Sequence, residues 1–247
     1  MADLGIGIEG LFHFDNSGRV VSSEKFPELT HMNTPRIWKG MHPWIKEHFG
    51  DRFQGTITHY DALGSALRTA TGFCKDANGA STHFVIDRDG TLYQLASIHD
   101  RTWHAGQNAN EWSENGGWYV MPNGEKTKNP NHWFLGIDLS NWGYLSKTSN
   151  GKYVSYAGVE VAASDVVSKN GRYWEKYTPR ALKTYGELLF ALVKELGLQK
   201  EMNIGHSDSA PKNKLDPGPA LPRQEILDLV YSMMTQVDPH RKGCEEI

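Results

Sequence analysis

The clearest helical pattern of the chain lies between residues 178 and 196. Apolar side chains recur there at spacings of three and four residues, which places them along one face of a helix. They are Leu182, Tyr185, Leu189, Val193 and Leu196. Thr178 stands where an N-cap is expected, and Pro179 follows at the first helical position, where its missing amide hydrogen costs nothing. The pattern predicts a buried helix that begins at Pro179.

Two further helices are predicted on either side of this one. The first is marked by Ala62, Ala66, Leu67 and Ala70, and it is expected to end at Gly72. The second, near the C-terminus, is marked by Ile226, Leu227, Leu229, Val230 and Met233.

Strand patterns fall between the helices. Thr56 to His59 is predicted as a short strand, and residues 134–139 as an apolar strand whose single carboxylate is Asp138. In residues 83–95 two apolar runs flank an Asp-Gly pair, which favours a tight hairpin because these residues tolerate positive φ angles. Strands separated by helices predict an α/β domain with a central mixed β-sheet flanked by helices.

The organisation along the chain indicates one domain with additions. We expect residues 1–50 to be an irregular N-terminal extension packed on the main domain, which spans 51–237, and residues 238–247 to be a polar tail. An insertion at about 141–176 is longer than most connections in compact domains. Its middle is rich in strand-forming residues, so we expect an inserted hairpin near the end of the Asp138 strand, rimming the site.

Composition excludes several classes of partner. The 247 residues carry a formal charge of −3, so no field favours nucleic acid or an anionic membrane. No run of about 18 apolar residues occurs, and the N-terminus lacks the features of a secretory signal. We therefore expect a monomer made in the cytoplasm without a signal peptide and without integral membrane association. Cys74 and Cys244 lie far apart and are expected to be reduced thiols.

Candidate chemistry appears near the C-terminal end. His206 and Asp216 lie ten residues apart, joined by a segment too rich in Pro, Gly and Asn to be regular structure. Such a segment brings two metal ligands together. Catalytic zinc sites typically hold the ion with three protein ligands and keep a fourth position for water. The best candidate for the third ligand is His59, at the end of a predicted strand.

Four segments together resemble a known family, the type 2 zinc-dependent N-acetylmuramoyl-L-alanine amidases, which are related to phage amidase lysozymes and peptidoglycan-recognition proteins. The resemblance covers about residues 55–235 and rests on the order and spacing of the segments. They are Thr58-His59-Tyr60, residues 83–90, Trp103-His104-Ala105-Gly106, and the stretch from Gly205-His206 through Lys214 to Asp216-Pro217-Gly218.

The resemblance implies a zinc enzyme that hydrolyses the amide between N-acetylmuramic acid and the first L-alanine of the peptidoglycan stem. It implies that Zn²⁺ is bound by His59, His206 and Asp216, and that Lys214 steadies the reacting oxygen. Trp103 and His104 are expected either to bind the substrate, which is intact peptidoglycan or a soluble muropeptide, or to pack the wall of the pocket.

One departure from the family concerns the general base. Bacterial members of the family read Gly-Ile-Glu-Leu on the central strand, whereas this chain has Asp138 at the glutamate position. Aspartate is shorter by one methylene, roughly 1.5 Å. Either the backbone compensates, a water bridges the gap, or the enzyme is slow. Phage relatives use a tyrosine just before the strand that begins at His83, but here that position is Thr82.

Other functions remain open at this point. A non-catalytic peptidoglycan-binding module could share the fold, although the retention of Asp216 argues against it. A zinc amidohydrolase of another N-acyl peptide is the second alternative, because function depends on the site and not on the fold. The setting also stays open: the cytoplasm for a recycling enzyme, or the cell wall or periplasm for a phage lysin or an injected toxin.

Overall fold

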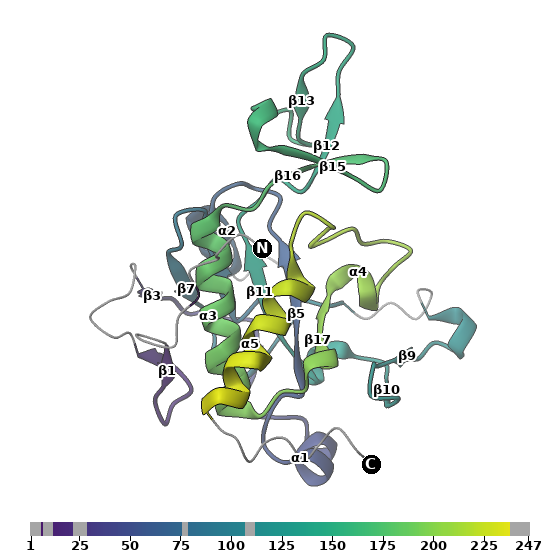
Figure 1. Ribbon diagram of the computed structural model, residues 1–247. Helices are drawn as coiled ribbons and strands as arrows, with labels where there is room; N and C mark the ends of the chain where they lie inside the picture. The colour runs from purple at the N-terminus through teal and green to yellow at the C-terminus, as the bar shows by residue number, and fades with distance from the viewer. Residues whose placement is uncertain (1–5, 7–11, 22–28, 76–78, 107–111, 238–247) are drawn as a thin grey trace.

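The computed structural model describes residues 6, 12–21, 29–75, 79–106 and 112–237 (Figure 1). The predicted polar tail at 238–247, with Cys244, lies outside the described residues. The helices are α1 (Pro43–Phe49), α2 (Ala66–Phe73), α3 (Pro179–Leu196), α4 (His206–Ser209) and α5 (Arg223–Val237). The strands are β1 (His13–Phe14), β2 (Val20–Val21), β3 (Leu29–His31), β4 (Ile37–Trp38), β5 (Gly55–Tyr60), β6 (Phe84–Ile86), β7 (Leu92–Gln94), β8 (Arg101–Thr102), β9 (Tyr119–Val120), β10 (Lys126–Thr127), β11 (Phe134–Leu139), β12 (Tyr144–Lys147), β13 (Tyr153–Val154), β14 (Glu160–Val161), β15 (Val166–Lys169), β16 (Arg172–Glu175) and β17 (Asn203–Gly205).

A central six-stranded sheet has the strand order β17-β5-β11-β6-β7-β3. The first four strands in this order are parallel, β7 is antiparallel to β6, and β3 is parallel to β7. The predicted mixed sheet and the β6–β7 hairpin are confirmed. Because β17, β5 and β11 are parallel neighbours, their carboxyl ends meet at one edge of the sheet, which is where α/β proteins commonly place their ligands.

Helices cover both faces of this sheet. On one face, α3 packs against α5, and the Tyr185 hydroxyl of α3 lies 2.8 Å from Oγ1 of Thr58 on β5. On the other face, Ala66 and Ala70 of α2 pack against Val85 of β6. Val85 stands opposite Asp138 in the parallel register, so both side chains point to the α2 face.

The helix α3 confirms its sequence pattern. The Thr178 hydroxyl accepts a hydrogen bond from the Ala181 amide at 3.2 Å, and Pro179 occupies the first turn. All five residues of the predicted apolar stripe are buried. Gly197 ends the helix with a left-handed φ of 69°, a conformation that glycine adopts without the steric cost of a Cβ.

The start of α2 differs from the prediction, because Ala62 is not helical. The helix begins at Ala66, with the Ser65 side chain as its N-cap, and it ends at Phe73, one residue beyond Gly72. Ala62 has a φ of 54°, and its amide donates to the Asn141 carbonyl at 3.0 Å. A turn that ties the ends of β5 and β11 together therefore overrides the local helical spacing.

The N-terminal extension is more regular than expected. Its described residues contain four short strands and α1, and β3 joins the central sheet beside β7. Phe12, Val20 and Ile45 are buried in the main core. The backbone groups of β3 are paired by β7, and this long-range pairing cannot be predicted from the local sequence. The division into 1–50, 51–237 and 238–247 stays a prediction.

The insertion is a five-stranded antiparallel sheet with the order β14-β13-β12-β16-β15, so the expectation of a single hairpin was incomplete. It projects from the main body (Figure 1). At its base, buried Glu175 accepts two hydrogen bonds from Arg88, at 2.5 and 2.8 Å, which tie β16 to the β6–β7 turn. None of the described helices has the length and apolar character needed to cross a bilayer.

Candidate metal centre

Three predicted metal ligands meet at the carboxyl edge of the central sheet. His59 is the penultimate residue of β5, and His206 directly follows β17, the neighbouring strand. Asp216 arrives on the loop after α4, where the Ser207 amide donates to the Asp216 carbonyl at 2.8 Å. The parallel register therefore brings together side chains that are 147 and 157 residues apart along the chain.

The three side chains form a close triangle of ligand atoms. Nδ1 of His59, Nδ1 of His206 and Oδ2 of Asp216 lie 3.0 Å from one another along each side. All three residues are buried, with 5–8% of their surface exposed. Ligands about 2.0 Å from one tetrahedral ion stand roughly 3.3 Å apart, which is close to the observed spacing.

His104 determines which nitrogen of His59 is free. Nε2 of His104 lies 3.0 Å from the Phe134 carbonyl, which can only accept, so this nitrogen carries the proton. Nδ1 of a neutral His104 is then an acceptor, and it lies 3.1 Å from Nε2 of His59. His59 therefore donates through Nε2 and keeps an unprotonated Nδ1 inside the triangle. Such an outer hydrogen bond is the usual way to orient a metal-binding histidine.

The electrostatics of the triangle favour a neutral His59 and an ionised Asp216. Burial, and then the nearby charge of His206, lower the pKa of His59 to about 4. Burial alone would raise the pKa of Asp216, but the neighbouring imidazoles of His206 and His59 hold it well below the usual range. Burial, with His59 and His83 nearby, holds the pKa of His104 well below 6.5.

The three ligand atoms therefore point their lone pairs at one another, and there are too few protons to form a hydrogen bond along each side of the triangle. His59 Nδ1 and the Asp216 carboxylate are both acceptors, so at most one proton, on His206, could lie among the three atoms. A divalent cation at this point would satisfy all three at once. The donor set of two imidazoles and one carboxylate suits zinc, and the residues present therefore fit the metal that the family implies.

Asp138 lies beside the triangle on β11. It is opposite His59 in the parallel register, and side chains of such pairs share a face of the sheet. Burial raises the pKa of Asp138 to about 8, with smaller contributions from the charges of Asp61 and Asp216. The nearby Thr82 hydroxyl lowers this pKa, although its oxygen makes no well-formed hydrogen bond. The structure thus places a carboxyl on the strand beside His59, and its role as general base stays a prediction.

Gly136 explains how His104 comes so close to the sheet. A Cβ at this position would lie 2.6 Å from the Thr82 hydroxyl and 2.7 Å from Cγ of His104. Both contacts are shorter than normal van der Waals distances, so any larger residue would displace the imidazole. The glycine of the Gly-Ile-Asp segment therefore makes room for the residue that orients His59.

Trp103, His104 and Lys214 line a cavity of about 460 Å³ that also contains His206. The sequence predicted Trp103 and His104 as substrate-binding residues. Trp103 does face this cavity, and its ring stacks on Trp38 with 3.8 Å between centroids. His104 also lines the cavity, but both of its ring nitrogens are already engaged. Exposed Lys214 is close enough for its charge to lower the pKa of His59.

Asp61 holds the site together and was missed by the sequence reasoning. It is the residue after β5, and its carboxylate accepts hydrogen bonds from the turn and from the end of β11. The donors are the amides of Leu63, Gly64 and Asn141 at 3.1, 3.3 and 3.1 Å, and the Thr69 hydroxyl at 2.8 Å. An aspartate followed closely by glycine does favour such a turn, so a local signal was present.

Asn131 was also missed, and no local pattern indicates it. Its side-chain oxygen accepts from the amides of His104 and Ala105, both at 2.8 Å. Asn131 is buried, and it fixes the backbone of the segment that carries His104. Its partners lie 26 and 27 residues away, so only the tertiary structure reveals the role.

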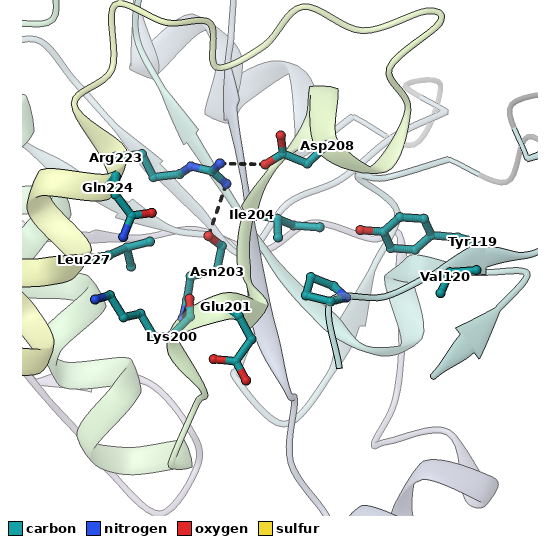
Figure 2. A pocket seen from close by; sticks show the side chains of 11 residues that line it. Tyr119, Val120, Lys200, Glu201, Asn203, Ile204, Asp208, Arg223, Gln224 and Leu227 are labelled. Atoms are coloured by element: carbon teal, nitrogen blue, oxygen red, sulfur yellow. Dashed lines mark hydrogen bonds and ion pairs between the residues drawn. The ribbon is translucent and has the colours of Figure 1, made fainter. Parts of the chain in front are cut away.

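Another cavity, of about 540 Å³, lies beside β17 and α5 (Figure 2). Arg223 there pairs with Asp208 at 2.6 Å and donates to the Asn203 carbonyl at 3.1 Å. Lys200 pairs with Asp228 at 2.8 Å. Both cations of this cavity are thus neutralised, and none of the described residues that line it is a predicted ligand or base. The chemistry therefore belongs to the metal centre.

Comparisons with solved structures find the same fold in other proteins. The fold is similar to that of AmpD, solved as a selenomethionine derivative, with a TM-score of 0.53 and 18% identity over 87% of this chain and 98% of that one. It is also similar to AmiD from E. coli, solved with anhydro-N-acetylmuramic acid-L-Ala-D-γ-Glu-L-Lys, with a TM-score of 0.50 and 18% identity over 87% of this chain and 64% of that one. For AmpDH3 from Pseudomonas aeruginosa the TM-score is 0.50, with 18% identity over 84% and 65% of the two chains.

No curated protein sequence matches the chain. At the level of families, the sequence matches the N-acetylmuramoyl-L-alanine amidases over residues 49–219, which is more than half of its length. This segment contains all three ligands of the triangle as well as Asp138 and Lys214. The chain therefore belongs to the N-acetylmuramoyl-L-alanine amidase family.

Proposed function

We propose that this protein is a zinc-dependent peptidoglycan amidase, which hydrolyses the amide between the lactyl group of N-acetylmuramic acid and the first L-alanine of the stem peptide. The observation that carries the proposal is the triangle of His59, His206 and Asp216 with the Asp138 carboxyl on the adjoining strand. The arrangement combines a metal-binding group with a general base at one point, as hydrolysis of an unactivated amide requires.

The three residues of the triangle would hold the zinc ion and leave a position for substrate and water. When bound at such a site, zinc polarises a carbonyl and lowers the pKa of water from 15.7 to about 7. His104 keeps His59 in the tautomer that can bind the metal. The low exposure of the ligands restricts solvent around the reacting atoms.

Asp138 is the proposed general base and acid. It takes a proton from the water whose oxygen forms the new bond to the carbonyl carbon. As the carbon–nitrogen bond breaks, Asp138 returns this proton to the nitrogen of L-alanine, so that a neutral amine leaves. A pKa near 8 in the metal-free protein suits a group that must both accept and release a proton. A metal cation next to the carboxyl would lower this value and favour the ionised form.

Lys214 is the proposed stabiliser of the carbonyl oxygen, on which negative charge grows during the attack. Its side chain lines the same cavity as His206 and is free to approach the substrate from the solvent side. One donor in such a role contributes roughly 3–4 kcal/mol to the stability of the transition state.

The ligand in the AmiD structure indicates the class of substrate. That compound joins a muramic acid sugar to a peptide whose glutamate is linked through its γ-carboxyl, which leaves the α-carboxylate free. We propose a substrate of the same class for this chain. The cavity of about 460 Å³ beside the triangle, with Trp103 on its wall, has room for part of a sugar or of the peptide.

Mass spectrometry of the reaction products tests the proposed function. We expect purified protein with Zn²⁺ to release the intact stem peptide with a free L-alanine amine from soluble muropeptides, from intact sacculi, or from both. The preferred substrate would also separate a recycling enzyme from a wall-degrading lysin or toxin. Binding to sacculi without any released peptide would favour the non-catalytic module. Equal hydrolysis of plain acetylated peptides would favour the broader amidohydrolase.

A substitution at His104 separates its two possible roles. We expect His104→Ala to weaken zinc affinity by about 10–100-fold, because His59 loses the acceptor that fixes its tautomer. Competition with a chromophoric chelator would measure this. His104→Asn, which offers an oxygen near the position of Nδ1, should recover part of the affinity. His132→Ala is the matched control, since His132 contacts Arg101 and Asn129 and does not contact His59. Unchanged zinc affinity with a raised KM would restore the substrate-binding role.

A further inference from the structure

A groove of about 650 Å³ runs between the inserted sheet and the loop that carries Asp216. Arg172 and Trp174 of β16 line one side of the groove, and Lys214, Pro217 and Gly218 line the other. Lys214 also lines the cavity that contains His206. The groove and the catalytic cavity therefore adjoin at Lys214, so a substrate that extends beyond the scissile amide can enter both.

The wall formed by the insertion is fixed to the metal-binding loop. Trp174 packs so closely on Gly218 that a Cβ there would lie 2.6 Å from the indole ring, and Gly218 also has a φ of +73°. The Tyr177 hydroxyl, just after β16, donates to the Pro217 carbonyl at 2.7 Å. These contacts, with the Arg88–Glu175 ion pair, hold β16 at a defined distance from the reacting centre.

Two of the cations that line this groove have no carboxylate partner among the described residues. Arg223 is neutralised by Asp208 at 2.6 Å. Neither Arg172 nor Lys214 has a carboxylate partner within 4.0 Å in the part of the chain that the structure describes, and both are exposed. The guanidinium of Arg172 lies over the Tyr144 ring, 5.7 Å from its centroid, which limits its conformations. The groove therefore offers a positioned arginine fork to an anionic ligand.

We infer that Arg172 binds a free carboxylate of the stem peptide, and that the inserted sheet thereby selects substrates whose glutamate α-carboxylate is not amidated. This inference rests on the proposed function. Arginine binds carboxylates through two parallel hydrogen bonds, a geometry that a primary amide cannot reproduce because one of its two heteroatoms is itself a donor. Lys214 stands nearer the scissile bond, which leaves Arg172 as the group that contacts the peptide beyond it.

A pair of substrates tests this selectivity. They are muramyl-L-Ala-D-γ-Glu-L-Lys with a free α-carboxylate and the same compound with that carboxylate amidated. We expect the wild-type protein to prefer the free acid in kcat/KM, and Arg172→Ala to lose about tenfold on the acid while changing little on the amide. Arg172→Lys should keep part of the preference, because it retains the charge but not the fork.

Lys147→Ala is the matched control on the same sheet. Lys147 lies over the rings of Tyr153 and Tyr173, at 5.5 and 5.7 Å, and does not line the groove. It should leave the acid-to-amide ratio unchanged. Since Arg172 is exposed, its substitution should not alter the unfolding temperature, which confirms that any effect is local.

Calorimetric titration with the free peptide L-Ala-D-γ-Glu-L-Lys gives a readout that does not depend on hydrolysis. We expect Arg172→Ala to weaken its binding by about the same factor as it lowers kcat/KM on the acid. Loss on both substrates alike, or no loss on either substrate and in titration, would overturn the inference. A wild-type protein that binds the peptide through Arg172 but hydrolyses neither substrate would refute the proposed function and leave this subsite standing.

Discussion

Replacing His206 with alanine is expected to remove metal binding and to lower amide hydrolysis by at least about a thousandfold. The loss follows because His206 supplies one of three ligand atoms that lie 3.0 Å apart, and two remaining ligands hold zinc poorly. A metal at such a site contributes several kcal/mol to the transition state, and each 1.4 kcal/mol corresponds to about a tenfold change in rate. Elemental analysis and the release of stem peptide would measure the two effects.

Removing the metal from the wild-type protein should have the same effect on activity as replacing His206. We expect about one zinc per chain, loss of activity with a chelator, and recovery when Zn²⁺ is added back. His132→Ala controls for the removal of a histidine, because the His132 ring contacts Arg101 and Asn129 and lies outside the triangle. A His206→Ala protein that stays fully active in chelator would rule out the metal mechanism.

Asp138→Asn is expected to keep the metal but to lose about 10²–10⁴ in kcat, the usual contribution of a general acid–base group. The amide has nearly the shape of the carboxyl but cannot take the proton from water. Asp138→Glu should be tolerated, since glutamate is the residue of the bacterial relatives. Rates on a soluble muropeptide, with zinc content measured in parallel, would separate the base from a ligand. An unimpaired Asp138→Asn protein would return Asp138 to a structural role.

Although Asp138→Asn should lower the rate, it should raise the stability of the metal-free protein against unfolding. In the metal-free protein burial raises the pKa of Asp138 from 3.8 to about 8, so the folded state favours the protonated form. The stability that this group contributes is fully present below about pH 4 and is lost as pH rises through about 8. Asparagine carries no charge at any pH. The unfolding temperature of metal-free Asp138→Asn should therefore exceed that of the wild type by a margin that grows over this range.

Asp61→Asn is the matched control for both measurements. Asp61 is a half-buried carboxyl at the end of a neighbouring strand, and burial raises its pKa as well, but its oxygens accept backbone and hydroxyl hydrogen bonds that hold the turn after β5. We expect its substitution to destabilise the fold at neutral pH. If Asp61→Asn were stabilising and Asp138→Asn destabilising, the assignment of the two carboxyls would be reversed.

Local patterns in the sequence were enough to predict the elements that position the site. The apolar stripe and the N-cap of α3, the β6–β7 turn and the apolar strand around Asp138 all depend on residues a few positions apart. The candidate ligands could also be predicted, because His206 and Asp216 lie in one irregular loop and His59 ends a strand. To predict these features, it is enough to know the periodicity of apolar residues, the residues that favour turns, and the donor atoms that a metal prefers.

Other features depend on contacts between distant segments. The engagement of His104 with His59 and Phe134 requires the register of β5 and β11, and it cannot be predicted from the Trp-His-Ala-Gly segment alone. The positive φ of Ala62 follows from the turn that joins those two strands. The position of Trp174 on Gly218 likewise depends on the packing of the insertion.

The sequence by itself thus determined which residues can carry the chemistry, because residue type and short-range spacing set the available donors and secondary structure. Only the tertiary structure decided what each donor faces. The contacts of His104 with His59 and with Phe134 leave His59 unprotonated at Nδ1, and burial raises the pKa of Asp138 to about 8. Tautomer and proton affinity are properties of the surroundings, and the surroundings form only when the chain folds.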